Sequence, residues 1–156
     1  MYSFRKSKKG FTLIELMVVV AIIGVLSLLG LRLYTGQQEK AKNALVKANC
    51  GTIQTLIQAE LADRPVTDLD LYTELNTRVF NNAGLYNPVT GNPETLVAGN
   101  FLTTALPVNV VPPTGAAKGS VVVGYVLATG VFYINGKSAG TTNEWVFTQS
   151  PLSARK

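Results

Sequence analysis

The sequence has no histidine, a single cysteine (Cys50) and no proline before Pro65. Without histidine, the usual proton shuttle at neutral pH is missing, and so are His-containing triads and His/Cys zinc sites. One cysteine cannot form a disulfide within the chain, so cysteine content gives no guide to the redox compartment. No nucleotide-binding glycine loop occurs either. We therefore expect no enzyme, no catalytic residue, no metal site and no cofactor.

Positive charge is abundant only at the start of the chain. The 156 residues include 14 lysines and arginines against nine acidic residues, a formal net charge of +5. Four of the basic residues precede Gly10, and without them ten basic residues face nine acidic ones. Because no basic cluster remains beyond this segment, the sequence predicts no specific nucleic-acid site.

The longest hydrophobic run extends from Phe11 to Leu31, and Glu15 is its only charged residue. As a helix it spans about 31 Å, the thickness of a bilayer core, and it is longer than a secretory signal requires. The preceding basic residues predict a cytoplasmic N-terminus and export of the remainder. We therefore expect a single-pass protein of the cytoplasmic membrane.

Glu15 has two interpretations when this run is considered alone. A carboxylate within a membrane span costs about 2.5–3.5 kcal/mol on insertion scales and commonly marks a functional site. Alternatively, Glu15 lies in the first helical turn, near the interface and the positive end of the helix dipole.

The string KKGFTLIELMVVVAIIGVL, residues 8–26, closely resembles the start of type IV pilins and pseudopilins. The resemblance implies that a prepilin peptidase cleaves between Gly10 and Phe11 and that Phe11 is then N-methylated. It also implies an assembly role for Glu15, which would pair with the Phe11 ammonium of a neighbouring subunit. Such a pair neutralises two charges that a bundle of hydrophobic helices would not accept singly.

The sequence departs from the family pattern in one respect. Pilins usually have a proline about a dozen residues after the glutamate-bearing turn, where the helix often melts in the filament, whereas Arg32 stands near that point here. Gly24 and Gly30 could still permit local unwinding because glycine is a poor helix former. Arg32 and Tyr34 are also typical of the outer membrane interface.

Helical periodicity continues from Gln37 to Ala62, which predicts one helix from about Phe11 to about Ala62. The apolar residues of its second half are Ala41, Leu45, Ala48, Leu56 and Ala59 on one face, with Ile53, Ile57 and Leu61 adjoining. Cys50 within this helix is interpreted as a structural thiol, with an intersubunit disulfide as the alternative. A plain membrane anchor with a helical stalk remains an alternative on composition.

The residues after Pro65 predict a small head. Thr67 to about Ala83 reads as a short helix ended by Gly84, and residues 86–94 as a turn-rich loop. Residues 120–128, 131–135 and 144–149 are predicted strands of an antiparallel meander covering the helix, with Trp145 or Phe147 in the core or at an interface. Lys137 is expected to be solvated. The predicted class is α+β, in which a long N-terminal helix packs against a small antiparallel sheet, as in type IV pilins.

Four segments follow from this interpretation: a cleaved leader (residues 1–10), a transmembrane and filament-core half-helix (11–36), a second half-helix packed on the head (37–65) and a globular head (66–156). The resemblance implies a major pilin that forms a helical surface filament for adhesion, motility or DNA uptake. Its partners would be other copies of the chain, the peptidase, the assembly machinery and the membrane. The alternative is a pseudopilin acting as a periplasmic piston; electron transfer along the aromatic residues, 8% of the chain, is a third hypothesis.

Overall fold

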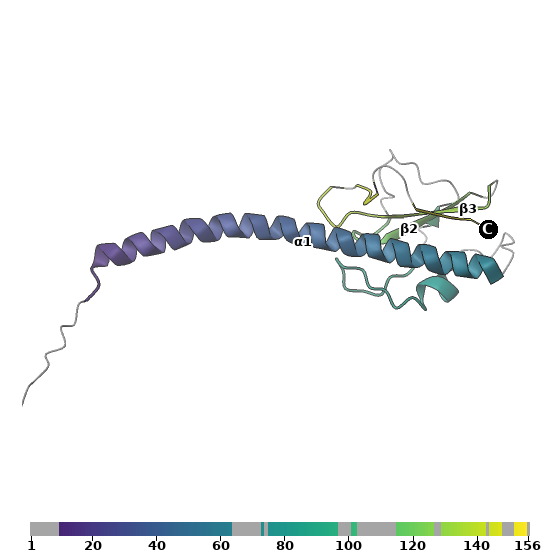
Figure 1. The fold of residues 1–156 in the computed structure, drawn as a ribbon, viewed down its shortest axis with the longest axis horizontal. Coiled ribbons are helices and arrows are strands. Elements are labelled where there is room, and N and C mark those ends of the chain that lie inside the picture. Colours follow the sequence, from purple (N-terminus) through teal and green to yellow (C-terminus); the bar gives the residue numbers. More distant parts are fainter. Residues whose placement is uncertain are drawn as a thin grey trace, which may run out of the picture. The chain divides into compact units, whose positions relative to one another are not determined.

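The computed structural model describes residues 10–63, 73, 75–96, 101–102, 115–126, 129–142, 144–147 and 152–155. These residues form a helix α1 (Leu13–Asp63), a short π-helix η1 (Leu75–Phe80) and four strands, which are β1 (Phe101–Leu102), β2 (Val121–Val126), β3 (Val131–Gly136) and β4 (Leu152–Arg155) (Figure 1). The chain divides into two compact units, Met1–Gln38 and Glu39–Lys156, and each is described by itself.

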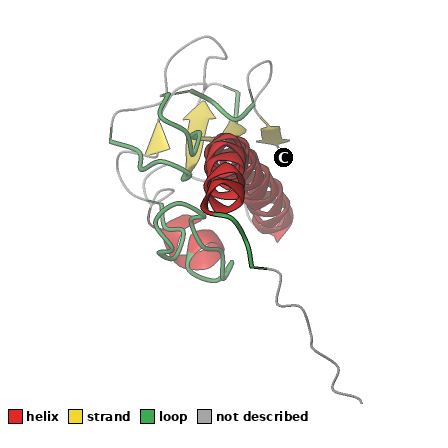
Figure 2. Cartoon of the chain, turned by 90° about the vertical axis from the view of Figure 1, so that its left-hand side faces the viewer, coloured by secondary structure: helices red, strands yellow, loops and turns green. Residues whose placement is uncertain are grey.

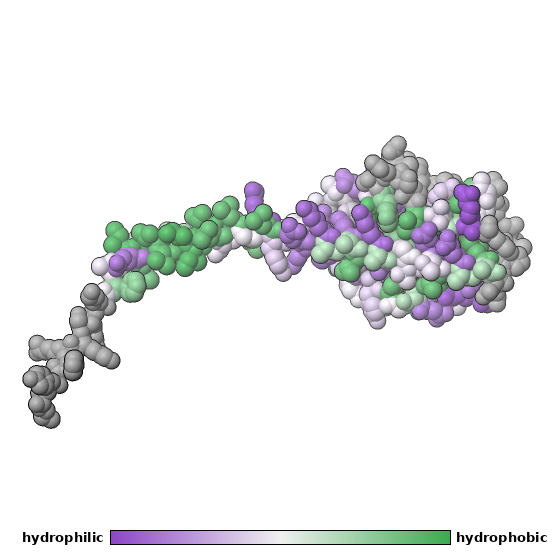
Figure 3. Space-filling view, in the orientation of Figure 1, coloured by the Kyte–Doolittle hydropathy of each residue, from purple (hydrophilic) through white to green (hydrophobic). Residues whose placement is uncertain are grey.

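The predicted long helix is confirmed, because α1 covers 51 residues and its ends lie within two residues of the expected ones. The absence of proline allows this length, since an internal proline would remove a backbone hydrogen bond. Gly24, Gly30 and Arg32 all lie within continuous helix. Apolar side chains gather over the N-terminal part of α1 (Figure 3). By length and composition α1 could cross a membrane.

Within the second unit, α1 buries one of the two adjoining apolar faces that the sequence indicates. The fully buried positions are Val46, Cys50, Ile53, Ile57 and Leu61. Their spacing of three or four residues is one helical stripe. The other predicted face is exposed at Ala41, Leu45, Ala48 and Ala59, and only Leu56 packs against the core. Of the two adjoining apolar faces that the sequence indicates, the one with Ile53, Ile57 and Leu61 is therefore the packed face.

The four strands form one sheet in the order β1-β2-β3-β4. Figure 2 shows the strands in yellow. β1 pairs with β2 in parallel over two residues, and β2, β3 and β4 are antiparallel. One face of β2 presents Val121, Val123 and Tyr125 to the helix, where they share a buried cluster with the α1 stripe. The predicted α+β class, with the helix packed on a small antiparallel sheet, is confirmed.

The third predicted strand, residues 144–149, was wrong over its described part. Residues 144–147 form an isolated bridge at Trp145 with Lys137 rather than a strand, and residues 146–147 are bends. The Asn135 side chain makes the hydrogen bonds to Phe147 that the backbone of a neighbouring strand would make. Its amide nitrogen donates to the Phe147 carbonyl (3.0 Å), and its amide oxygen accepts from the Phe147 N–H (3.1 Å). β4 is instead the third antiparallel strand, which the sequence did not predict.

The predicted short helix is described over η1, while residues 64–72 lie outside the described part of the chain. Three apolar residues of this segment, Leu75, Val79 and Phe80, are buried. Gly84 has a φ of 61°, the left-handed conformation expected of a glycine that follows a helix end. The last turn is wider than an α-helix, since the Asn81 N–H bonds the Asn76 carbonyl at 2.9 Å.

The burial of Cys50 and of Lys137 tests the predictions made for these two residues. Cys50 is fully buried and unpaired, which agrees with a structural thiol and leaves no exposed sulfur for an intersubunit disulfide in this fold. The prediction that Lys137 is solvated was wrong, because the residue is only 8% exposed and its Nζ donates to the Ala116 carbonyl at 2.7 Å. Trp145 is buried beside Ala116 and Val122, and Phe147 packs against the main cluster.

Three amide side chains fasten the head to α1. The Asn43 oxygen accepts from the Ala139 N–H (2.8 Å), Asn49 donates to the Tyr86 carbonyl (3.1 Å) and Gln54 donates to the Ser153 carbonyl (2.8 Å). Each contact ties the helix to a different segment of the head. These bonds add directional attachments to the hydrophobic packing of a domain that has no disulfide.

Candidate functional site

Thr12 and Glu15 form a reciprocal hydrogen-bonded cap at the start of α1. The Thr12 N–H and hydroxyl both donate to Oε2 of Glu15, at 2.8 and 2.7 Å, and the Glu15 N–H lies 3.3 Å from the Thr12 hydroxyl oxygen. Because the helix begins at Leu13, Thr12 is the N-cap residue and Glu15 is the third helical residue. This arrangement is a capping box, which satisfies backbone N–H groups that a helix start leaves unpaired.

The cap adds a role that the sequence interpretation of Glu15 missed. The signal was present, because Thr-Leu-Ile-Glu has the S/T-x-x-E spacing of a capping box. Both bonds from Thr12 end on the same carboxylate oxygen, Oε2. Among the described residues, Oε1 of Glu15 forms no hydrogen bond. The carboxylate therefore fixes its own helix end with one oxygen and leaves the other available.

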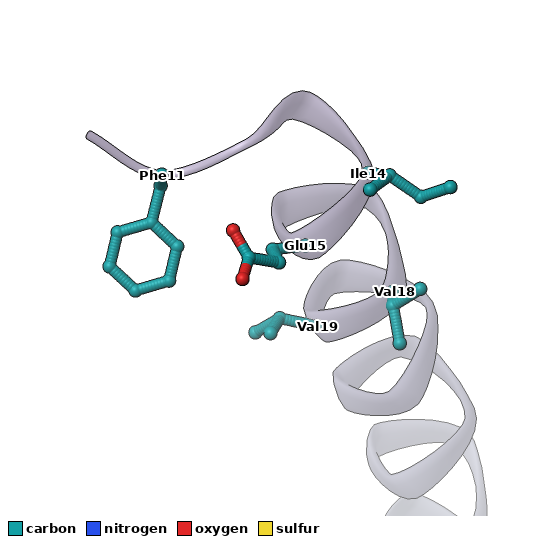
Figure 4. Close-up of a pocket in the computed structure, with 5 residues that line it drawn as sticks. All are labelled: Phe11, Ile14, Glu15, Val18 and Val19. Atoms are coloured by element: carbon teal, nitrogen blue, oxygen red, sulfur yellow. The ribbon is translucent and has the colours of Figure 1, made fainter. Parts of the chain in front are cut away.

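Phe11 and Glu15 lie on the same side of the helix start. Figure 4 shows the Glu15 carboxylate pointing to the side on which the Phe11 ring lies. A shallow groove there is lined by Phe11, Ile14, Glu15, Val18 and Val19. Apart from the carboxylate its lining is apolar, so a hydrophobic partner that brings a cation would complement it.

Gly10 and Phe11 precede the first helical turn. Neither residue is helical, both are exposed, and Phe11 is 87% accessible. The structure thus brings Gly10, Phe11 and Glu15 together within one short segment at the helix end. Among the described residues, no group of three or more His, Cys, Asp or Glu is placed to hold a metal ion.

The apolar part of α1 that follows is exposed on every face. Its large hydrophobic residues from Leu13 to Tyr34 have between 48% and 76% of their surface accessible. An apolar surface of this extent is far larger than soluble proteins usually leave in contact with water. Lipid or other protein chains must therefore cover it.

Comparison with known proteins identifies a motif at the start of the chain. Residues 5–31 match the prokaryotic N-terminal methylation motif, and this match contains Gly10, Phe11 and Glu15. The match covers the basic residues from Arg5 and the whole hydrophobic run from Phe11 to Leu31. The start of the chain is therefore similar to proteins that carry this motif.

Curated proteins similar to the chain are fimbrial and pilin proteins. The chain is 41% identical to the fimbrial protein EcpB of Eikenella corrodens over 40% of each chain. It is 33% identical to a probable minor fimbrial protein of Dichelobacter nodosus over 61% of this chain and 59% of the relative. It is 40% identical to the type IV major alpha-pilin of Moraxella bovis over 35% of each chain. Motif, fold and relatives together support the type IV pilin family for this chain.

The similarity has a defined extent. The chain spans between about a third and three fifths of the length of these relatives. No solved structure matches it. All three relatives bear the names of fimbrial or pilin proteins, and the expectation that the chain is not an enzyme agrees with them.

Proposed function

We propose that this protein is a structural subunit of a type IV pilus, in which the apolar half of α1 packs among the same segment of other copies. The observation that supports this most directly is the exposure of every large hydrophobic side chain from Leu13 to Tyr34. Burial of apolar surface stabilises association by about 25 cal/mol per Å². A bundle of such helices would bury this surface more completely than a single copy can.

Before assembly, the same segment would anchor the chain in the cytoplasmic membrane. Its length suits a bilayer core, and the basic residues before Gly10 favour retention of the N-terminus in the cytoplasm. Residues 1–10 would be the leader that prepilin peptidase removes, and Phe11 would then be N-methylated. The assembled head, residues 66–156, would form the surface of an extracellular filament together with residues 37–65.

Cleavage would create the charge that Glu15 needs as a partner. Removal of Gly10 converts the Phe11 amide nitrogen into an ammonium, and a neighbouring subunit could present it to Glu15. The capping box supports this pairing, because Thr12 uses Oε2 and leaves Oε1 without a hydrogen bond among the described residues. One carboxylate would then stabilise its own helix and set the register of the next subunit.

Replacement of Glu15 tests this proposal. Glu15→Gln and Glu15→Ala should still be cleaved, but sheared surface filaments should fall at least tenfold because the neighbour's ammonium loses its partner. Glu144→Gln, which removes an exposed carboxylate of the head, is the control and should assemble normally. Mass spectrometry of membrane and sheared fractions should find a methylated Phe11 terminus. Normal filaments from both Glu15 variants would refute the pairing.

A pseudopilin that acts as a periplasmic piston is the alternative function. It would share the leader, Phe11 and Glu15, so these residues do not separate the two functions. The names of the relatives favour a fimbrial role. Deletion of the gene distinguishes them, because loss of surface fibres indicates a pilin, and loss of protein secretion without any fibre indicates a piston. Adhesion, motility and DNA uptake can be assayed in the same deletion strain.

A further inference from the structure

The segment from Leu85 to Thr95, called here the Glu94 loop, is closed on itself. Tyr86 and Pro93 form an antiparallel bridge, and the Glu94 N–H donates to the Leu85 carbonyl at 2.7 Å. At its tip, the Asn87 side-chain oxygen accepts from the N–H groups of Val89 (2.8 Å) and Thr90 (3.1 Å). The loop is therefore internally organised by its own hydrogen bonds.

Two side chains attach this loop to the sheet. Asn87 donates to the Lys118 carbonyl at 3.0 Å, in the turn that precedes β2. Glu94 accepts the N–H of Val121, the first residue of β2, through Oε1 at 2.7 Å. Glu94 thus links the end of the loop directly to the start of the central strand.

The second oxygen of Glu94 is buried without a partner. Glu94 is 3% exposed, and its Oε2 has no hydrogen bond among the described residues. An ionised carboxylate in such surroundings is costly, because one hydrogen bond replaces a full hydration shell. A protonated carboxyl is neutral and avoids most of this cost. The buried position therefore favours the protonated form of the Glu94 carboxyl.

Among the residues that the structure describes, the groups around Glu94 offer no compensating charge. One titratable group that interacts with Glu94 is the Cys50 thiol of α1. Burial raises the pKa of this thiol, and the negative charge of Glu94 raises it further. Arg78 of η1 pairs with Glu60 at 3.5 Å, the Lys118 side chain is exposed, and Nζ of Lys137 donates to the Ala116 carbonyl. Burial raises the pKa of Glu94 to about 7, although the Val121 bond acts in the opposite direction.

We propose that Glu94 is a pH-sensitive latch: the protonated carboxyl holds the Glu94 loop against β2, and the ionised carboxylate draws the loop outward to water. A surface pocket lined by Asn81, Gly84, Tyr86 and Glu94 lies on this side of the head. Because Glu94 already lines this pocket, a small outward movement of the loop would expose its carboxylate to water there. The latch concerns the head alone, so it does not depend on the proposed filament function.

The direction of the effect follows from the two ionisation states. In the open form the carboxyl is solvated and titrates near 4.5, whereas in the closed form its pKa is about 7. Closure is therefore strongest below pH about 4.5, weakens as the pH rises to about 7 and stays weak above that. Between pH 5 and 8, opening of the loop should increase at least tenfold.

Hydrogen exchange and NMR on the full chain in detergent micelles test the latch. Protection factors of the Val121 and Glu94 amides, corrected for intrinsic exchange rates, should fall at least tenfold from pH 5 to pH 8. Glu94→Gln keeps an acceptor for the Val121 N–H but cannot ionise. In this variant the protection factor of the Val121 amide should therefore be independent of pH. Glu144→Gln removes an exposed carboxylate and should behave like the wild type.

The carboxyl itself can also be titrated in the wild-type chain, which keeps the test decisive if Glu94→Gln does not fold. The ¹³C resonance of the Glu94 carboxyl should titrate near pH 7, well above the ordinary glutamate value of 4.5. A midpoint near 4.5 would overturn the latch. So would a fall in Val121 protection that persists unchanged in Glu94→Gln.

Discussion

Gly136 of β3 lies so close to Val46 of α1 that a Cβ atom at position 136 would overlap the valine side chain. The same Cβ atom would also lie 3.2 Å from the Cys50 sulfur. Glycine therefore sets the distance between the sheet and the helix at this point. The contact lies within the second unit and positions the head on the part of α1 that carries it.

Gly136→Ala should destabilise the head by about 1–3 kcal/mol, the usual cost of overpacking a core. Gly51→Ala is the matched control, because a Cβ atom there meets no neighbour within 4 Å. The control should stabilise α1 by about 0.5–1 kcal/mol, since alanine is the better helix former. Urea denaturation of both variants in micelles measures the difference. Equal midpoints would contradict the close approach.

Gln54 of α1 helps to hold β4, the last strand of the sheet, in place. Gln54→Leu removes the bond to the Ser153 carbonyl and should cost about 1 kcal/mol, which is roughly a fivefold increase in opening of β4. Hydrogen exchange of residues 152–155 measures this local effect. Gln58→Leu changes an exposed residue of the same helix and should leave β4 unaffected. Equal exchange in the two variants would show that packing alone holds the strand.

The sequence predicted the elements whose signals are local. α1 followed from an apolar run and the absence of proline, and Gly84 followed from the preference of glycine for left-handed backbone. The cap at Thr12 and Glu15 was equally local, and its spacing was readable. These features need no knowledge of distant contacts.

Contacts between distant residues were not predictable in the same way. β4 is four residues long, and its pairing with β3 depends on tertiary structure that alternation cannot reveal. Residues 144–147 have strand-like composition, yet Asn135 replaces a neighbouring strand beside Phe147. Likewise, nothing local distinguishes the buried Glu94 from the exposed Glu144. Long-range packing decided each of these cases.

Cys50 should be inert in the folded protein. Burial removes its accessible surface and raises the pKa of the thiol, which keeps the reactive thiolate scarce. Alkylation by iodoacetamide at pH 8 should therefore be at least a hundredfold slower than in urea. Non-reducing electrophoresis of sheared material should show no Cys50-linked dimer. Rapid labelling of the native chain, or a reducible dimer, would support the intersubunit disulfide instead.

The stability of the head should fall as the pH rises through the range in which Glu94 ionises. Its pKa in the folded state, about 7, is above the ordinary value of 4.5, so the unfolded chain loses this proton first. The loss begins near pH 4.5, is complete near pH 7 and amounts to at most about 3 kcal/mol. Urea midpoints at pH 5 and pH 8 measure it. Glu94→Gln should flatten this profile, and an unchanged profile would assign the effect to other groups.

The capping box at the start of α1 predicts a graded response to changes at Thr12. Thr12→Val removes the hydroxyl bonds but keeps the backbone bond to Glu15, so the first turn should lose about 1 kcal/mol. Thr12→Ser retains the hydroxyl and is the control. Amide protection of residues 14–16 in micelles should fall about fivefold in Thr12→Val only. Because Glu15 can still pair with a neighbour's ammonium, we expect Thr12→Val to reduce filament yield less than Glu15→Ala. An equal loss of filaments would indicate that the cap itself presents the carboxylate for assembly.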